Sequence, residues 1–201
     1  LNTRALIRPM TLGNVPTDLV LDTGRFSFEE AQRAPGWLQE MRGGHVPETE
    51  EYGIGSFAWR ARRPLHPQRF HDFLHQGLFR HGRLLRSKGY FWLATRCHYA
   101  GSWQQAGGIL QHGPAGAWWA AVPDRYWPED EEALQAIEAR WQEPWGDRRQ
   151  ELVFIGQGLD RAAFTAALDA CLLTDAEMAL GRDGWAALPD PFPAWEAAEA
   201  A

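Results

Sequence analysis

The sequence contains only two cysteines, Cys97 and Cys171, among its 201 residues. Two thiols cannot build the disulfide framework of a small secreted domain, and no signal-peptide pattern is present, so we expect a cytoplasmic location. The sequence also has no run of about 18 apolar residues, the length that a membrane-spanning helix needs. These absences argue against disulfide-stapled secreted modules and against a membrane partner.

Several motifs of nucleotide and catalytic chemistry are missing as well. There is no G-x-x-x-x-G-K-[ST] or G-x-G-x-x-G loop for phosphates, no G-x-S-x-G elbow, and no H-E-x-x-H or C-x-x-C metal motif. Lys88-Gly89 follows no glycine-rich loop. We therefore predict no catalytic residue and no cofactor in this chain itself.

The composition is that of a folded domain with an acidic balance. Apolar residues make up 45% and charged residues 23%, and the net charge is −6. This charge argues against a generally cationic surface, so nucleic acid is an unfavoured partner. Eleven tryptophans predict a core or an interface built on indoles, with an exposed aromatic platform as the alternative.

Proline, glycine and charge divide the chain into four parts. Residues 1–45 contain two short apolar segments, 5–7 and 18–21, that are typical of strands, followed by helical patterns at 28–31 and 37–41. Residues 46–52 carry three glutamates and a proline and are predicted to be a linker. Residues 53–193 hold most of the apolar segments, and 194–201 form an Ala/Glu tail.

The pattern in residues 53–193 predicts alternating short strands and helices. The expected strands are 55–60, 84–95, 102–110, 117–122 and 151–156, with a loop at 112–116. The expected helices are 67–76, 129–142, 160–173 and a short one at 175–178 that Thr174 caps. Adjacent Trp118 and Trp119 would point to opposite faces of a strand. Strands close in sequence favour antiparallel pairing, so we predict an α+β fold, a two-layer sandwich with helices on one face of the sheet.

Histidines concentrate between residues 60 and 100, which holds five of the seven. His71 and His75 are spaced i, i+4, so one helix face could present two imidazoles to a divalent metal. Cys97 and His98, at the end of a predicted strand, are further candidate ligands. Two ligands alone hold zinc poorly, so the alternative is that these are surface or packing histidines.

The same stretch, Arg60–Ala100, is strongly basic. It contains nine Lys and Arg residues and one acid, Asp72, whereas residues 129–143 contain six acids and only Arg140. One interpretation is a cationic face for an anionic partner, such as an autonomous module for an acidic peptide or nucleic acid. The other is that basic and acidic elements face each other and partly neutralise.

Several segments, taken in order, resemble the C-terminal domain of the CobW family. They are residues 83–95 (RLLRSKGYFWLAT), 101–108 (GSWQQAGG), 118–123 (WWAAVP), 146–156 (GDRRQELVFIG) and 168–174 (LDACLLT). The opening residues 1–5 (LNTRA) are similar to the L-N-P-x-A that trails the family's GTPase domain, with Thr3 in place of proline.

The resemblance implies a piece of a longer GTP-dependent metallochaperone, of the branch associated with zinc. Residues 1–45 would then be the end of an α/β P-loop GTPase domain, and the missing Met at position 1 fits a fragment. GTP, magnesium and zinc would belong to the parent protein, whose GTPase domain carries the motifs that no position here matches. The implied partners are that GTPase domain and a client metalloprotein. Arg86, Lys88 and Arg148 are the residues that we expect to contact one of these partners. The more conservative interpretation is structural: Gly146 forms a turn and Asp147 pairs with an arginine.

Overall fold

The structure is a computed structural model that describes residues 6–29 and 53–195, and the chain divides into two units, Leu1–Pro47 and Glu48–Ala201. Within residues 6–29 of the first unit, Thr11 and Asn14 form an isolated β-bridge and η1 (Thr17–Leu19) is a single 3-10 turn. The strands predicted at 6–7 and 18–21 are wrong, because no partner strand lies within these residues and an unpaired apolar segment forms no ladder. The pattern at 37–41 and the linker at 46–52 fall outside the described residues.

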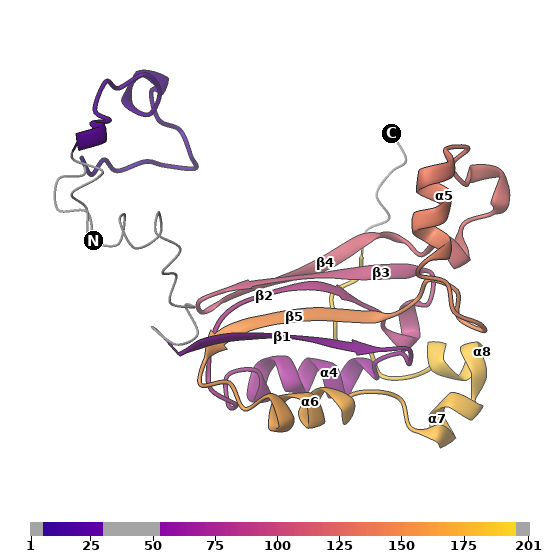
Figure 1. Ribbon diagram of the computed structural model, residues 1–201. Helices are drawn as coiled ribbons and strands as arrows, with labels where there is room; N and C mark the ends of the chain where they lie inside the picture. The colour runs from indigo at the N-terminus through magenta and orange to yellow at the C-terminus, as the bar shows by residue number, and fades with distance from the viewer. Residues whose placement is uncertain (1–5, 30–52, 196–201) are drawn as a thin grey trace. The chain divides into compact units, whose positions relative to one another are not determined.

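Five antiparallel strands form the sheet of the second unit. They are β1 (Ile54–Ala61), β2 (Arg83–Phe91), β3 (Tyr99–Ala106), β4 (Ile109–Ala117) and β5 (Gln150–Gln157), in the spatial order β1-β5-β2-β3-β4. Two helices cover one face: α4 (Pro67–Asp72), continued by the π-helical turn η2 (Phe73–Gly77), and α6 (Arg161–Asp169) (Figure 1). The predicted two-layer α+β sandwich is confirmed.

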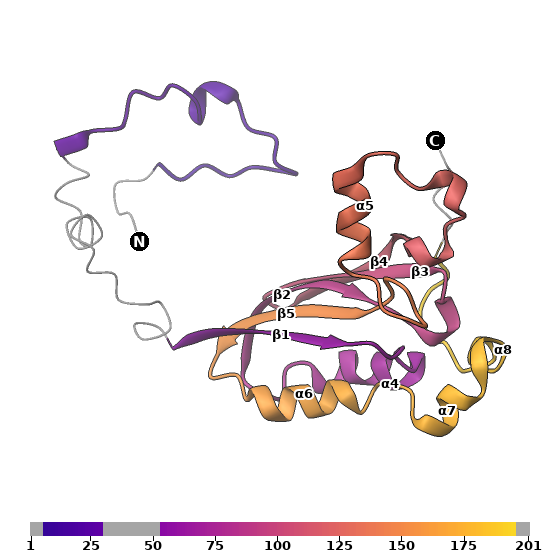
Figure 2. The same cartoon turned by 45° about the vertical axis from the view of Figure 1, so that its right-hand side comes forward.

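The remaining helices gather at one end of the sheet. α5 (Glu131–Glu138) stands on the side away from α4 and α6, whereas α7 (Asp175–Ala179) and α8 (Gly181–Ala186) lie on their side (Figure 2). Residues 118–149, which leave β4 and return as β5, contain α5 and the 3-10 turns η4 (Trp119–Ala121) and η5 (Asp124–Tyr126). No helix among the described residues is long and apolar enough to cross a bilayer.

The core lies between the sheet and the helices α4 and α6. The helix predicted at 67–76 is present as α4 and η2, and its i, i+3, i+4 face packs on the sheet, because Phe70, Phe73 and Leu74 are all buried. Phe164 of α6 packs 4.6 Å, centroid to centroid, from Phe154 of β5. A second cluster at the end of the sheet is built on Trp92, Trp118 and Trp185. Each fully buried aromatic or aliphatic side chain contributes about 1.5–3 kcal/mol, so these faces fix which side of the sheet is covered.

Two predicted strands differ from the structure. The chain turns at residues 107–108, where Gly107 has a φ of +56°, so β4 occupies the predicted loop 112–116 and its neighbours. Pro114 is tolerated there because β4 is an edge strand. The predicted strand 117–122 is wrong: Trp118 is buried in the second cluster and Trp119 begins η4.

The boundaries of two other elements also shift. The strand predicted at 84–95 ends at Phe91, because the Trp92 backbone N–H donates to the side chain of Gln150 and the chain then forms η3 (Ala94–Arg96). The helix predicted at 129–142 is limited to α5, which begins after the Asp130 cap. The cap predicted at Thr174 is confirmed as a capping box with Glu177.

Candidate functional site

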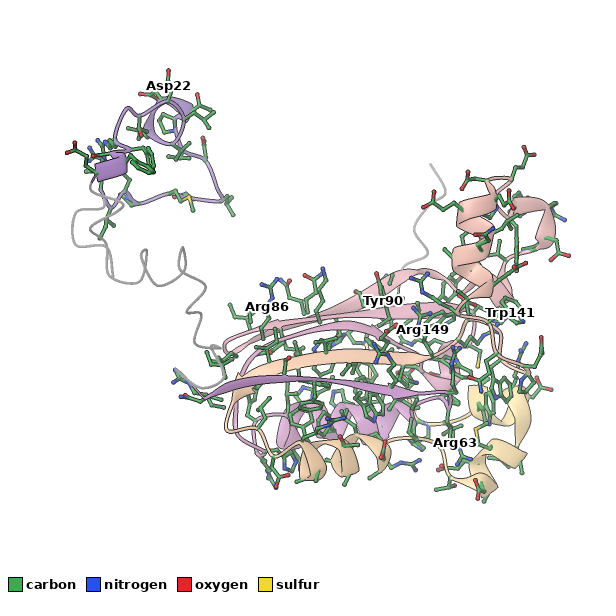
Figure 3. The ribbon with its side chains drawn as sticks, in the orientation of Figure 1. Asp22, Arg63, Arg86, Tyr90, Trp141 and Arg149 are labelled. Carbon is green, nitrogen blue, oxygen red and sulfur yellow. The ribbon has the colours of Figure 1, made fainter. Side chains whose placement is uncertain are left out.

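The face of the sheet opposite α4 and α6 is the candidate site, and we call it the uncovered face. The strand register places three rows across it: Ser56–Ile155–Arg86–Ala106–Ile109, Ala58–Val153–Lys88–Gln104–Gln111 and Arg60–Glu151–Tyr90–Ser102–Gly113. Every one of these residues is exposed or half-buried. Figure 3 shows Arg86 and Tyr90 on this side of the sheet. The uncovered face is therefore a continuous surface contributed by all five strands.

Arg86 and Lys88 lie near the middle of the uncovered face, on β2. They help to line a depression of about 290 Å³ together with Gln104, Gln111 and Ile109 of the neighbouring strands, and its lining contains no carboxylate. Among the described residues neither Arg86 nor Lys88 has a salt bridge. Tyr90, Val153 and Ile109 are large side chains that remain 39–70% exposed beside them.

The structure explains why a glycine, Gly89, follows Arg86 and Lys88 in the segment RSKG at 86–89. Its φ is +152°, and a Cβ there would collide with the backbone carbonyl oxygen of Glu151. The glycine thus lets β2 approach β5 closely at the point between Lys88 and Tyr90. Its role is structural, and it positions the two flanking side chains on the uncovered face.

Arg148 does not lie on a surface, which corrects its assignment as a contact residue. Its side chain is buried, and its guanidinium donates from Nε to the Cys97 carbonyl (2.7 Å), from Nη1 to the Trp145 carbonyl (3.1 Å) and from Nη2 to the Ala120 carbonyl (3.2 Å). Burial lowers the pKa of Arg148 from its ordinary value. Arg148 therefore acts as a clamp: its hydrogen bonds join three loops, and its buried guanidinium is not presented to an external partner.

The neighbouring residues of the G-D-R segment also have structural roles. Gly146 adopts a φ of +66° in a turn, as the conservative interpretation predicted. The predicted pairing of Asp147 with an arginine side chain is not found within residues 53–195, where its carboxylate instead accepts hydrogen bonds from the backbone N–H groups of Trp119 (3.1 Å) and Ala120 (3.0 Å). The segment thus fixes the start of η4 above the end of the sheet.

The candidate metal ligands do not form one site. The rings of His71 and His75 lie 4.0 Å apart, centroid to centroid, as their helical spacing predicted. Cys97 is buried in the second cluster, where burial raises the pKa of its thiol, and His98 is exposed at the start of β3. Within residues 6–29 and 53–195, no three His, Cys, Asp or Glu side chains are grouped so that they could hold a metal ion.

His112 is a neighbour of the histidine pair that sequence reasoning missed. It lies on β4, faces inward and contacts Phe192, which also contacts His71. The pKa of His112 is lowered, first by burial and then by the positive charge of His71, His75 and Arg96. His112 lies near the pair because its side chain is on the inward face of β4, opposite Trp103. Residues 112–116 of this strand were predicted to be a loop, so the sequence did not indicate a face for His112.

The basic stretch is neutralised in part, but not by the acidic helix α5. Its ion pairs reach other elements: Arg63 pairs with Asp175, Arg69 with Glu177 and Arg96 with Asp190. Arg60 shares Glu151 of β5 with Arg149. In the part of the chain that the structure describes, no salt bridge joins the stretch to residues 129–143. Acidic residues of β5, α7 and the C-terminal segment therefore neutralise part of the basic stretch, and its role toward an anionic partner stays a prediction.

A second depression, of about 380 Å³, lies where the uncovered face meets residues 139–140. Arginines from three segments line it: Arg60 and Arg62 at the end of β1, Arg140 after α5, and Arg149 before β5. Glu151 is the only carboxylate in the lining, and it accepts from Nε of both Arg60 (3.0 Å) and Arg149 (2.8 Å). Figure 3 shows Arg149 at this end of the sheet. The basic stretch of the sequence includes Arg60 and Arg62, but no pattern in the sequence joins them to Arg140 and Arg149.

Residues 53–195 define the class, an α+β domain whose five-stranded antiparallel sheet packs α4 and α6 on one face and, within these residues, exposes a row of basic side chains on the other. The family model "Cobalamin synthesis protein cobW C-terminal domain" matches residues 54–172, more than half of the chain. The chain belongs to the CobW C-terminal domain family.

The relatives support this assignment. The zinc-regulated GTPase metalloprotein activator 1 of Dictyostelium discoideum is 42% identical over 96% of this chain and 40% of its own length. A zinc chaperone of Mycobacterium tuberculosis is 36% identical over 76% of this chain and 37% of its own length. The chain thus spans about two fifths of the length of the curated relatives it matches. The Zn(II)-bound YjiA GTPase from E. coli is 19% identical, with a TM-score of 0.44, over 86% of this chain and 45% of that one.

Proposed function

We propose that this chain is the C-terminal regulatory and interaction region of a GTP-dependent zinc metallochaperone. The family match and the 42% identity along almost the whole chain to a zinc-regulated GTPase metalloprotein activator support this proposal. Because the chain spans 40% of that relative, we assign GTP hydrolysis, and the use of GTP, magnesium and zinc, to the remainder of a longer parent. In this layout residues 1–45 end the GTPase domain, 46–52 are the linker and 53–193 form the C-terminal domain.

The observation that carries the proposed role is the uncovered face. Arg86 and Lys88 stand among the exposed side chains of Tyr90, Val153 and Ile109, and neither cation has a salt bridge in the described residues. Apolar and aromatic side chains beside basic ones are typical of a protein interface, and no other layer of residues 53–195 covers them.

The partner that we propose for this face is the GTPase domain of the same protein. A short linker holds a tethered neighbour at an effective concentration on the order of millimolar, so a weak interface suffices for docking. A client metalloprotein is the second candidate partner, and it would compete for the same face. Docking of this kind would let the C-terminal domain respond to the nucleotide state of the GTPase domain.

The test measures binding of residues 1–201 to the separately produced GTPase domain of the parent, by calorimetry. The double variant Arg86→Glu with Lys88→Glu reverses two exposed charges and should raise the Kd at least tenfold, with an unchanged melting temperature. Arg80→Glu is the matched control, because Arg80 is exposed and outside the uncovered face. Equal binding by the parent chain and the double variant would refute the proposed role of this face.

A further inference from the structure

The depression lined by Arg60, Arg62, Arg140 and Arg149, which we call the arginine depression, has an unequal charge balance. Four guanidinium groups face one carboxylate, Glu151. The nearby carboxylate of Asp147 already accepts from the two backbone N–H groups at the start of η4. An unbalanced set of arginines in a depression favours a negatively charged ligand.

Not all of the guanidinium donors are available. Arg62 donates to the carbonyls of Arg140 (2.8 Å), Gly146 (3.2 Å) and Arg148 (3.2 Å), so it serves to hold the walls of the depression together. Burial, and then the positive charge of Arg149, lower the pKa of Arg62. Arg62 and Arg149 line the same depression, so an anion between them would reduce the repulsion of their like charges.

The other three arginines retain donors. Arg60 uses Nε for Glu151, and neither of its terminal nitrogens has an acceptor within residues 53–195. Arg149 uses Nε for Glu151 and Nη1 for the Asp147 carbonyl, and Arg140 uses Nη1 for the Ala136 carbonyl. Glu151 thus orients Arg60 and Arg149, and the hydrogen bonds from both arginines keep its pKa low, so it stays ionised. The remaining N–H groups can donate bidentate hydrogen bonds to an oxyanion.

We propose that the arginine depression binds an acidic segment of a protein partner, through carboxylates that pair with Arg60, Arg140 and Arg149. Its volume of about 380 Å³ exceeds what one carboxylate fills and accommodates two acidic side chains. The depression also shares Arg60 and Glu151 with the uncovered face. A segment seated there continues onto the face, which a lone ion would not use. The site goes beyond the proposed docking of the GTPase domain, since Arg86 and Lys88 take no part in it.

The test uses a hexaglutamate peptide as the probe, with residues 1–201 in the calorimeter at 50 and 200 mM salt. We expect binding that weakens at the higher salt, and a Kd raised at least tenfold in the double variant Arg60→Gln with Arg149→Gln. Arg80→Gln removes one exposed charge elsewhere and should leave the Kd unchanged. Arg60→Lys with Arg149→Lys keeps both charges but loses the bidentate geometry, and should weaken binding by an intermediate factor.

Three outcomes would overturn the proposal. The first is no binding of hexaglutamate at 50 mM salt by a chain that melts cooperatively. The second is binding that all the variants retain, which would mean a diffuse charge effect. The third is binding of inorganic phosphate with the same arginine dependence but no binding of the peptide, which would make this a phosphate site. Arg86→Gln with Lys88→Gln should weaken hexaglutamate binding much less than Arg60→Gln with Arg149→Gln does, so failure here and failure of the proposed docking face are distinguishable.

Discussion

Replacing Arg148 with alanine should destabilise the domain, whatever partner it binds. The change leaves three backbone carbonyls, those of Cys97, Ala120 and Trp145, without their charged donor. Each buried group left unsatisfied costs about 1–3 kcal/mol, and removal of the buried charge itself offsets part of the sum. We therefore expect a loss of about 2–4 kcal/mol in the free energy of unfolding. For a chain of this size that corresponds to a melting temperature lower by roughly 5–15 °C.

The assay is thermal and urea unfolding of residues 1–201, followed by circular dichroism. Arg148→Lys should also be destabilised, because one ammonium cannot reach carbonyls on three separate segments. Arg86→Ala is the control on the surface and should stay within about 0.5 kcal/mol of the parent chain. If Arg148→Ala has the melting temperature of the parent chain and loses only partner binding, the structural role assigned to Arg148 is refuted.

Three further predictions concern the sheet and its charged groups. Gly89→Ala should destabilise the domain by about 3 kcal/mol or more in urea unfolding, because its Cβ has no space against β5, whereas Gly108→Ala, with nothing within 4 Å, should be neutral. The folded state lowers the pKa of His112 below its ordinary 6.5, so the native chain binds fewer protons than the unfolded chain near this pH. The free energy of unfolding should therefore fall as pH drops from 7.5 through 6.5 to 5.5. His112→Gln should flatten the melting-temperature profile in this window, and an unchanged profile would refute the assignment. Glu177→Gln should lower the free energy of unfolding by about 1.5–3 kcal/mol at pH 7, because hydrogen bonds from Arg69 hold the pKa of Glu177 at about 2. This stabilisation is present above pH 4.5 and is lost as pH falls toward 2. Acid unfolding should therefore depend less on pH in the variant.

Local patterns predicted the elements whose signal is contained in a few neighbouring residues. The helix at 67–76, the strand β5 and the helix cap at Thr174 follow from spacing and from side-chain chemistry within one or two turns. Prediction failed at residues 107–122. There the glycines were interpreted as loop residues, although Gly113 and Gly116 lie in the edge strand β4, while the aromatic Trp118 and Trp119, typical of strands, left the sheet. Burial of Trp118 in the second cluster outweighed its strand propensity.

The candidate sites divide in the same way. Sequence patterns were enough for the family resemblance, for the i, i+4 pairing of His71 and His75, and for placing Arg86 and Lys88 on one strand. Three features follow only from the packing of the whole domain: β5 lies between β1 and β2, Arg148 is buried, and Arg60, Arg140 and Arg149 share a depression. The physical reason is separation along the chain: Arg62 bonds to carbonyls 78–86 residues away, and no local propensity or periodicity encodes a contact that the packing of the whole domain creates.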